Sequence, residues 1–190
     1  MKYSKLKADL MDMFDEKKLH MLPEEWGFFN EFDREINIIG YAVNLTEEII
    51  EKARQQQIEF LVTHHDSWEF IFGLKESCSK MLEESGITHA YFHAPLDDAE
   101  FGTSASLGKK LGMGGLEKVM PYAEIYYGGV IGEIEPVDFN VFRERLTDIL
   151  AEQVRCYQNN ENPVRKVAVA AGGGNMTTEM RIAAEAGCDT

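Results

Sequence analysis

Short apolar runs alternate with amphipathic helical stretches along this chain, and this alternation restricts the fold more than any other feature of the sequence. Runs rich in β-branched and aromatic residues occupy 36–43, 58–63 and 87–93. Segments with helical spacing occupy 44–57, 75–85 and 104–111. Strands that alternate with helices are typical of a layered α/β sheet with parallel segments. The sequence therefore predicts an α/β fold.

The second half of the chain adds an antiparallel element to this pattern. Two short strands within 123–134 meet at Gly128-Gly129, which predicts a hairpin-like turn at the glycines. An amphipathic helix follows over about 138–156, and "RKVAVA" predicts a buried strand before a last helix. The polar loop 158–163 is the best internal boundary. We expect residues 1–190 to form one domain with a mixed sheet and a possible division near 157–163.

The balance of charges limits the classes of partner. There are 19 Lys and Arg residues against 33 Asp and Glu residues, which gives a formal charge of −14. Such a surface repels nucleic-acid phosphates and anionic membranes, so neither is expected as a partner. No run approaches the roughly 18 apolar residues of a membrane span. Three widely spaced cysteines and no apolar leader segment favour a cytoplasmic protein.

Two adjacent histidines end the strand predicted at 58–63, in the stretch "FLVTHHDSWEF". Neighbouring side chains in a strand point to opposite faces, so we expect the strand to end at about Thr63 and both imidazoles to lie in the following turn. There, His64 and His65 could converge on one cleft and bind Zn, Fe, Ni or Cu. Two adjacent histidines alone are more often structural and hydrogen-bonded to backbone or water.

A second group of metal-competent residues follows the next strand. In "YFHAPLDDAEFG", His93 ends the strand and Asp97 follows in a turn that contains proline. Ligands of α/β sheets gather at the carboxyl ends of strands, where both groups are expected. We therefore select His64, His65, His93 and Asp97 as candidate site residues. His89 lies deeper on the same strand and is interpreted as a core or supporting histidine.

The stretches "FLVTHHDSWEF", "HAPLD…FGTSASLGKKLGM", "GGVIGEI" and "VAVAAGGG…AAEAGCDT" together resemble the dinuclear-metal-centre proteins. These are also called Nif-three-like proteins and carry the label GTP cyclohydrolase I type 2 homologue. The resemblance covers most of the chain, and the HH pair with HxPLD is its specific part. It implies a three-layer α/β fold with helices on both faces, and a homohexameric ring.

The resemblance also implies two divalent metal ions per subunit, of a kind among Zn, Fe, Mn and Ni. Matched position by position, His64, His65 and Asp97 correspond to metal ligands. His93 corresponds to a histidine beside the same site, to which we assign a supporting or proton-transfer role. The family pattern has Pro-Leu after the histidine pair, where this chain has Asp66-Ser67. The family pattern also has a His and a Glu ligand near the C-terminus. Because no histidine follows His93 in this sequence, we expect the C-terminal segment to be lacking here.

Two hypotheses about function stay open at this point. The first is a divalent-metal-dependent hydrolase that acts on a nucleotide or another phosphoester, GTP cyclohydrolase-like by family label only. The alternative is a ring-shaped metal-binding or interaction protein without catalysis.

The glycine segment "VAVAAGGGNMTTEM" is a separate feature of the sequence, and it lacks the spacing of a P-loop or of GxGxxG. We interpret it as a close-packed turn rather than a nucleotide site.

Overall fold

The structure, a computed structural model, describes residues 1–173 and 176–190 and divides into two compact units. The first unit is Met1–Pro95 and the second is Leu96–Thr190. The internal boundary predicted near 157–163 lies within the second unit, and the prediction of one domain stays a prediction. Every helix among the described residues is too short or too polar to cross a lipid bilayer.

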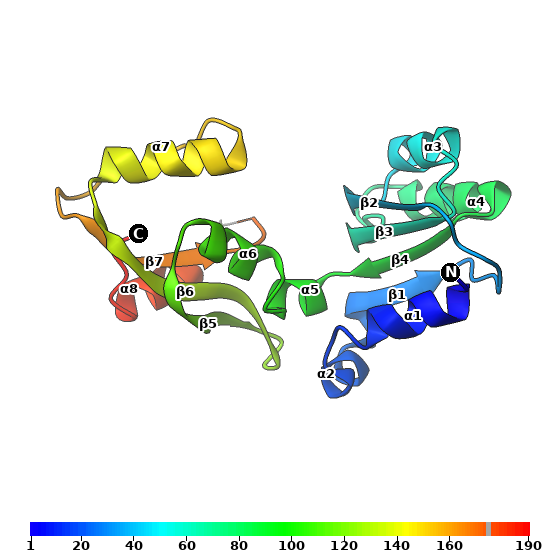
Figure 1. The fold of residues 1–190 in the computed structure, drawn as a ribbon, viewed down its shortest axis with the longest axis horizontal. Helices are drawn as coiled ribbons and strands as arrows, with labels where there is room; N and C mark the ends of the chain where they lie inside the picture. Colours follow the sequence, from blue (N-terminus) through cyan, green and yellow to red (C-terminus); the bar gives the residue numbers. More distant parts are fainter. Residues whose placement is uncertain (174–175) are drawn as a thin grey trace. The chain divides into compact units, whose positions relative to one another are not determined.

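The first unit is built on a four-stranded mixed sheet (Figure 1). Its strands, in spatial order, are β1 (Trp26–Phe29), β4 (Thr88–Phe92), β3 (Phe60–His65) and β2 (Ile39–Asn44). β2, β3 and β4 run parallel, whereas β1 is antiparallel to β4. The carboxyl ends of the three parallel strands therefore meet at one edge of the sheet, next to the start of β1.

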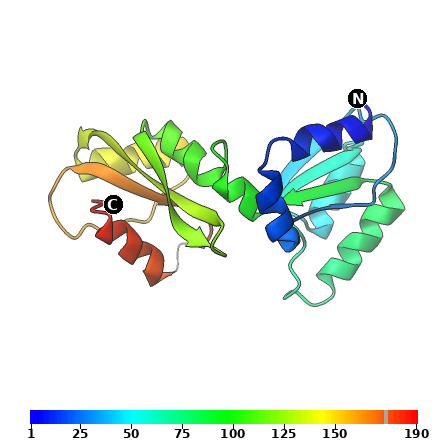
Figure 2. The same ribbon diagram turned by 90° about the horizontal axis from the view of Figure 1, so that it is seen from below.

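Helices cover both faces of this sheet (Figures 1 and 2). α3 (Glu47–Gln55) and α4 (Leu74–Ser85) bury Ile50 and Leu82 against Leu61 of β3. α1 (Tyr3–Met11) lies on the opposite face, followed by α2 (Glu16–Met21) and a single 3-10 turn at Pro23–Glu25. The predicted start of α3 is confirmed, because the Thr46 hydroxyl accepts a hydrogen bond from the backbone N–H of Ile49 at 3.3 Å.

The second unit contains a three-stranded antiparallel sheet of β5 (Gly114–Tyr122), β6 (Tyr126–Val137) and β7 (Val164–Ala170). α6 (Thr103–Lys110) and α7 (Phe139–Leu150) pack on one face of it. α8 (Thr177–Glu185) lies on the other face, as both views show (Figures 1 and 2). The short helix α5 (Ala94–Asp98) contains the point where the two units divide.

The hairpin turn predicted at Gly128-Gly129 is wrong. The chain turns instead at Ala123 and Glu124, whose φ angles are 47° and 67°. Gly129 lies inside β6, where a Cβ atom would approach the Met120 sulfur to 2.5 Å. Glycine at this position thus permits close packing between strands, a role that glycine in a strand often has.

The predicted α/β class with helices on both faces is confirmed, and the strands are shared between two sheets, one mixed and one antiparallel. The glycine segment connects β7 to α8. Gly174 and Asn175, which belong to that segment, lie outside the described residues. The interpretation of the segment as a close-packed turn therefore stays a prediction.

Candidate metal centre

The histidine pair lies within β3, which runs through His65 and does not end at Thr63 as predicted. The pairing of β3 with β4 nevertheless ends at Thr63 and Tyr91. Both histidines thus extend past the last β4 residue that pairs with β3. Their ring centroids lie 4.3 Å apart, although adjacent side chains in a regular strand point to opposite faces. The predicted convergence occurs, but at the end of a strand rather than in a loop.

His93 joins the pair to form a cluster of three imidazoles. It directly follows β4, and its ring centroid lies 5.2 Å from that of His64 and 5.0 Å from that of His65. One nitrogen from each of the three rings can be chosen so that all lie within 4.8 Å of one another. Three imidazoles at this spacing could hold a transition-metal ion, and three protein ligands leave further coordination positions for water or substrate.

Each ring of the three-histidine cluster is oriented by a hydrogen bond at its Nδ1 atom. The acceptors are the Phe92 carbonyl for His64 (3.1 Å), the Asn44 side-chain oxygen for His65 (2.6 Å) and a Glu25 carboxylate oxygen for His93 (2.5 Å). A neutral imidazole that donates from Nδ1 carries its lone pair on Nε2. Metal-binding histidines have this arrangement, because the supporting acceptor fixes the ring and its tautomer.

Two of these supporting residues were missed by the sequence analysis. Glu25 lies 68 positions before His93 and reaches it because β1 pairs antiparallel with β4. No local pattern in the sequence indicates that contact. Asn44 carries a weaker signal, since it is the polar residue at the carboxyl end of β2, opposite His65 in the register.

Burial and neighbouring charge keep His65 neutral. Its pKa is lowered from 6.5 to about 4, first by burial and then by the nearby His64 and His93 rings. The Trp68 ring contributes to its cover, with a centroid 4.5 Å from that of His65. A neutral imidazole is the form that binds a metal ion, so this environment favours coordination at neutral pH.

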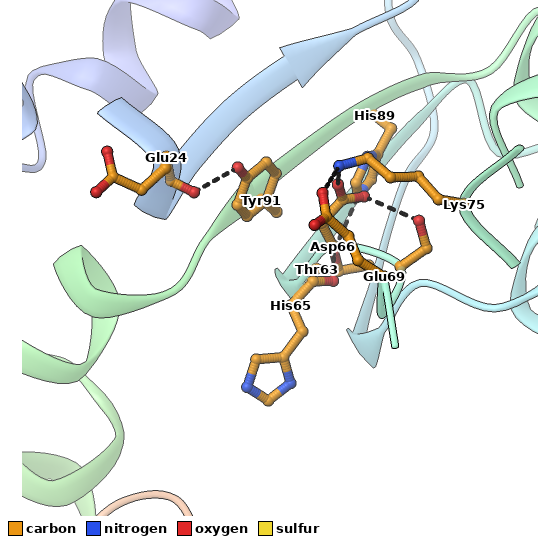
Figure 3. A network of polar contacts seen from close by, with 9 residues as sticks. Glu24, Thr63, His65, Asp66, Glu69, Lys75, His89 and Tyr91 are labelled. Carbon is orange, nitrogen blue, oxygen red and sulfur yellow. Dashed lines mark hydrogen bonds and ion pairs between the residues drawn. The ribbon is translucent and has the colours of Figure 1, made fainter. Parts of the chain in front are cut away.

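A buried hydrogen-bond chain supports the backbone of His65 (Figure 3). The Thr63 hydroxyl donates to the His65 carbonyl at 2.6 Å and lies 2.8 Å from Nε2 of His89. Because the single hydroxyl proton is directed at the carbonyl, Nε2 of His89 donates to Thr63. His89 is fully buried, and burial lowers its pKa to about 4. The interpretation of His89 as a packed core histidine is confirmed.

Asp66, the carboxylate that follows the histidine pair, forms an ion pair with Lys75. Asp66 lies 3.8 Å from the Lys75 amine, which also forms an ion pair with Glu69 at 2.5 Å (Figure 3). Asp66 itself is mostly buried, with 18% of its side chain exposed. The position after the histidine pair, where the resemblance implies proline, thus carries a negative charge paired with Lys75.

Asp97, the fourth candidate from the sequence, belongs to the second unit. There its carboxylate accepts a hydrogen bond from the Thr103 hydroxyl at 2.5 Å. The neighbouring Asp98 is buried, pairs with the Lys118 amine at 3.0 Å and accepts from the Tyr127 N–H at 3.2 Å. The role of Asp97 as a metal ligand stays a prediction.

Comparison with known proteins places the chain in a family. The model of the Duf34/NIF3 (NGG1p interacting factor 3) family matches residues 8–190. The chain belongs to this family. A relative from Pyrococcus horikoshii, named GTP cyclohydrolase 1 type 2 homolog, is 34% identical over 155 residues. That alignment covers 76% of this chain, and the chain spans about 60% of the length of the relative.

Solved structures agree with the Duf34/NIF3 assignment at the level of the fold. The protein ybgI, described as of unknown function, has a TM-score of 0.78 at 21% identity, with 100% of this chain and 76% of that chain covered. A Bacillus cereus protein related to NIF3 has a TM-score of 0.79 at 15% identity, with 100% and 81% covered. These structures show the fold alone, and the predicted family membership is confirmed by the family model and the Pyrococcus relative.

Proposed function

We propose that the chain belongs to a divalent-metal-dependent hydrolase, with His64, His65 and His93 as ligands of one ion. The observation that carries this proposal is the donor set: three imidazoles that can each offer a nitrogen within 4.8 Å of the other two, and each with Nδ1 engaged by an acceptor. Nitrogen ligands of this kind suit Zn, Fe, Ni or Cu. When bound, such an ion supplies Lewis-acid chemistry, since it polarises an oxygen of the substrate or of water.

The residues of the chain have separate roles in this proposal. Glu25 fixes the His93 ring and strengthens it as an electron donor through a charge-assisted hydrogen bond. Asn44 orients His65, and the Trp68 ring excludes water from one side of it. A nucleotide or other phosphoester is the proposed substrate, in line with the name of the Pyrococcus relative. The second ion, with Asp97 among its ligands, stays a prediction.

Elemental analysis of purified protein tests the metal proposal independently of any activity. We expect at least one transition-metal ion per chain, and its loss in the His64→Ala/His65→Ala variant. His20→Ala is the matched control, because His20 is exposed on α2 and should leave the metal content unchanged. A metal content unaffected by the double substitution would refute the assignment. A count of two ions would support the dinuclear centre.

Hydrolysis needs a second measurement on the same samples. Metal-loaded protein is assayed with GTP and with a chromogenic phosphodiester, before and after removal of the ion by a chelator. We expect turnover that disappears with the ion and returns on reconstitution. Bound metal without turnover on either substrate would contradict the hydrolase proposal and favour the non-catalytic metal-binding alternative. His93→Ala separates two roles, since a ligand loses the ion and a proton-transfer group keeps it but loses turnover.

A further inference from the structure

The loop between β3 and α4 carries exposed aromatic side chains directly after the histidine pair. Residues 66–73 read "DSWEFIFG" and contain three aromatic rings. Phe70 and Phe72 are 80% and 104% exposed, and Ile71 between them is 45% exposed. Single apolar residues on a surface are normal, whereas contiguous ones mark a binding surface. The loop therefore offers an apolar surface next to the three-histidine cluster.

Two of the rings connect this surface to the cluster. The centroid of the Trp68 ring lies 4.5 Å from that of His65 and 5.3 Å from that of Phe70. These are the separations of aromatic rings in contact, so His65, Trp68 and Phe70 form a continuous series of ring contacts. Trp68 is half-buried, whereas Phe70 is mostly exposed. A molecule held at His65 can therefore reach both rings.

Polar contacts hold the loop in one conformation. The Lys75 amine pairs with the Glu69 carboxylate at 2.5 Å and with the Asp66 carboxylate at 3.8 Å (Figure 3). The backbone N–H of Ile71 donates to the Trp68 carbonyl at 3.2 Å, which closes a turn around Phe70. A surface that is ordered before binding loses less conformational entropy when a ligand arrives. The two rings are thus arranged in advance of any ligand.

We propose that Trp68 and Phe70 form a platform on which a planar aromatic ring of the substrate stacks, while its phosphoryl group lies beside the three histidines. This inference rests on the proposed function, because it takes the substrate to be a phosphoester. It narrows that class to phosphoesters that carry a flat ring. Stacking uses the π-face that every nucleobase has, so the platform selects a flat ring and not one particular base.

The test compares two ligands that share a sugar and a phosphate but differ in the ring. Dissociation constants of guanosine 5′-monophosphate (GMP) and ribose 5-phosphate are measured by calorimetry, with the protein as purified and again after treatment with a chelator. We expect GMP to bind at least about tenfold more tightly than ribose 5-phosphate in both samples. Adenosine 5′-monophosphate should bind within about threefold of GMP, because both purines stack.

Substitutions in the loop assign the preference to the two rings. Phe70→Leu and Trp68→Leu should each reduce the preference for GMP over ribose 5-phosphate by about threefold or more. Phe72→Leu is the matched control from the same loop, since the Phe72 ring is 104% exposed and lies outside the series of ring contacts. It should leave the preference unchanged. Circular dichroism checks that each variant folds.

Three outcomes would overturn the proposal. The first is equal affinity for the two ligands in the wild type, or binding of neither. The second is a strong preference for guanine over adenine, which indicates hydrogen-bond readout of the base. The third is an equal loss in Phe72→Leu and Phe70→Leu. Because none of these measurements uses turnover, a failed hydrolase assay leaves the stacking result standing, and the reverse also holds.

Discussion

Acidification should destabilise the first unit through His89, which lies on β4 and contacts the Thr63 hydroxyl. Its side chain is fully buried, and burial lowers its pKa from 6.5 to about 4. Between these two pH values the unfolded chain binds a proton at this position and the folded chain does not. Stability therefore rises with pH across this window and falls as the pH drops from about 6.5 toward 4.

The size of the effect follows from the two pKa values. The gap between 6.5 and about 4 corresponds to roughly 3 kcal/mol when it is fully expressed, below pH 4. At pH 5 the unfolded form is almost fully protonated and the folded form is mostly neutral, so about 2 kcal/mol of this is already lost.

Urea unfolding at pH 7 and pH 5 measures this loss, with metal-free protein so that ligand binding does not contribute. Trp26 and Trp68 are the only tryptophans and both belong to the first unit, so their fluorescence reports its unfolding. His89→Gln keeps an N–H donor for Thr63 but cannot titrate. The unfolding free energy that this variant loses between pH 7 and pH 5 should be about 2 kcal/mol smaller than the loss in the wild type. His20→Gln, at an exposed position, should behave as the wild type.

Groups that titrate in both proteins, His65 among them, cancel in the difference between wild type and His89→Gln. The decisive quantity is therefore the change in unfolding free energy from pH 7 to pH 5, compared between the two proteins. Equal changes would refute the reasoning, since they would mean that His89 has the same pKa in the folded and unfolded chain.

Three further substitutions test other parts of the structure. Glu25→Gln removes the negative charge that orients His93, so metal affinity measured by competition with a chelator should fall about 10- to 100-fold, and an unchanged affinity would remove Glu25 from the site. Gly129→Ala forces a Cβ atom against Met120 and should lower the unfolding free energy by about 1–3 kcal/mol, which denaturant titration followed by circular dichroism would detect or disprove. Asp138→Ala removes the N-cap of α7 and should cost about 1 kcal/mol in the same titration, whereas no loss would show that the cap is dispensable.

Local patterns in the sequence predicted the features that depend on neighbours along the chain. Thr46 at the start of α3 and the placement of His64, His65 and His93 at strand ends follow from capping and from the α/β rule for ligands. Each of these signals lies within a few residues of the element that it marks. The cluster was thus partly predictable without any knowledge of the three-dimensional structure.

Features that depend on contacts between distant segments were not predictable in this way. Glu25 approaches His93 only because β1 joins the sheet antiparallel to β4, which no spacing in the sequence indicates. Gly129 was assigned to a turn because glycine serves both turns and close packing, and only the position of Met120 decides between them. The end of β3 was placed two residues early, since neighbouring strands rather than β3 itself determine where pairing stops.

The position of the three-histidine cluster in the sequence also determines when it can form during synthesis of the protein. Its three rings and the groups that orient them, from Glu25 to His93, all belong to the unit Met1–Pro95. The contact between Glu25 and His93 closes a loop of 68 residues, so the cluster cannot form until almost the whole unit has been translated. Chains fold domain by domain from the N-terminus as they are made. All residues of the three-histidine cluster are therefore synthesised before translation of the second unit starts.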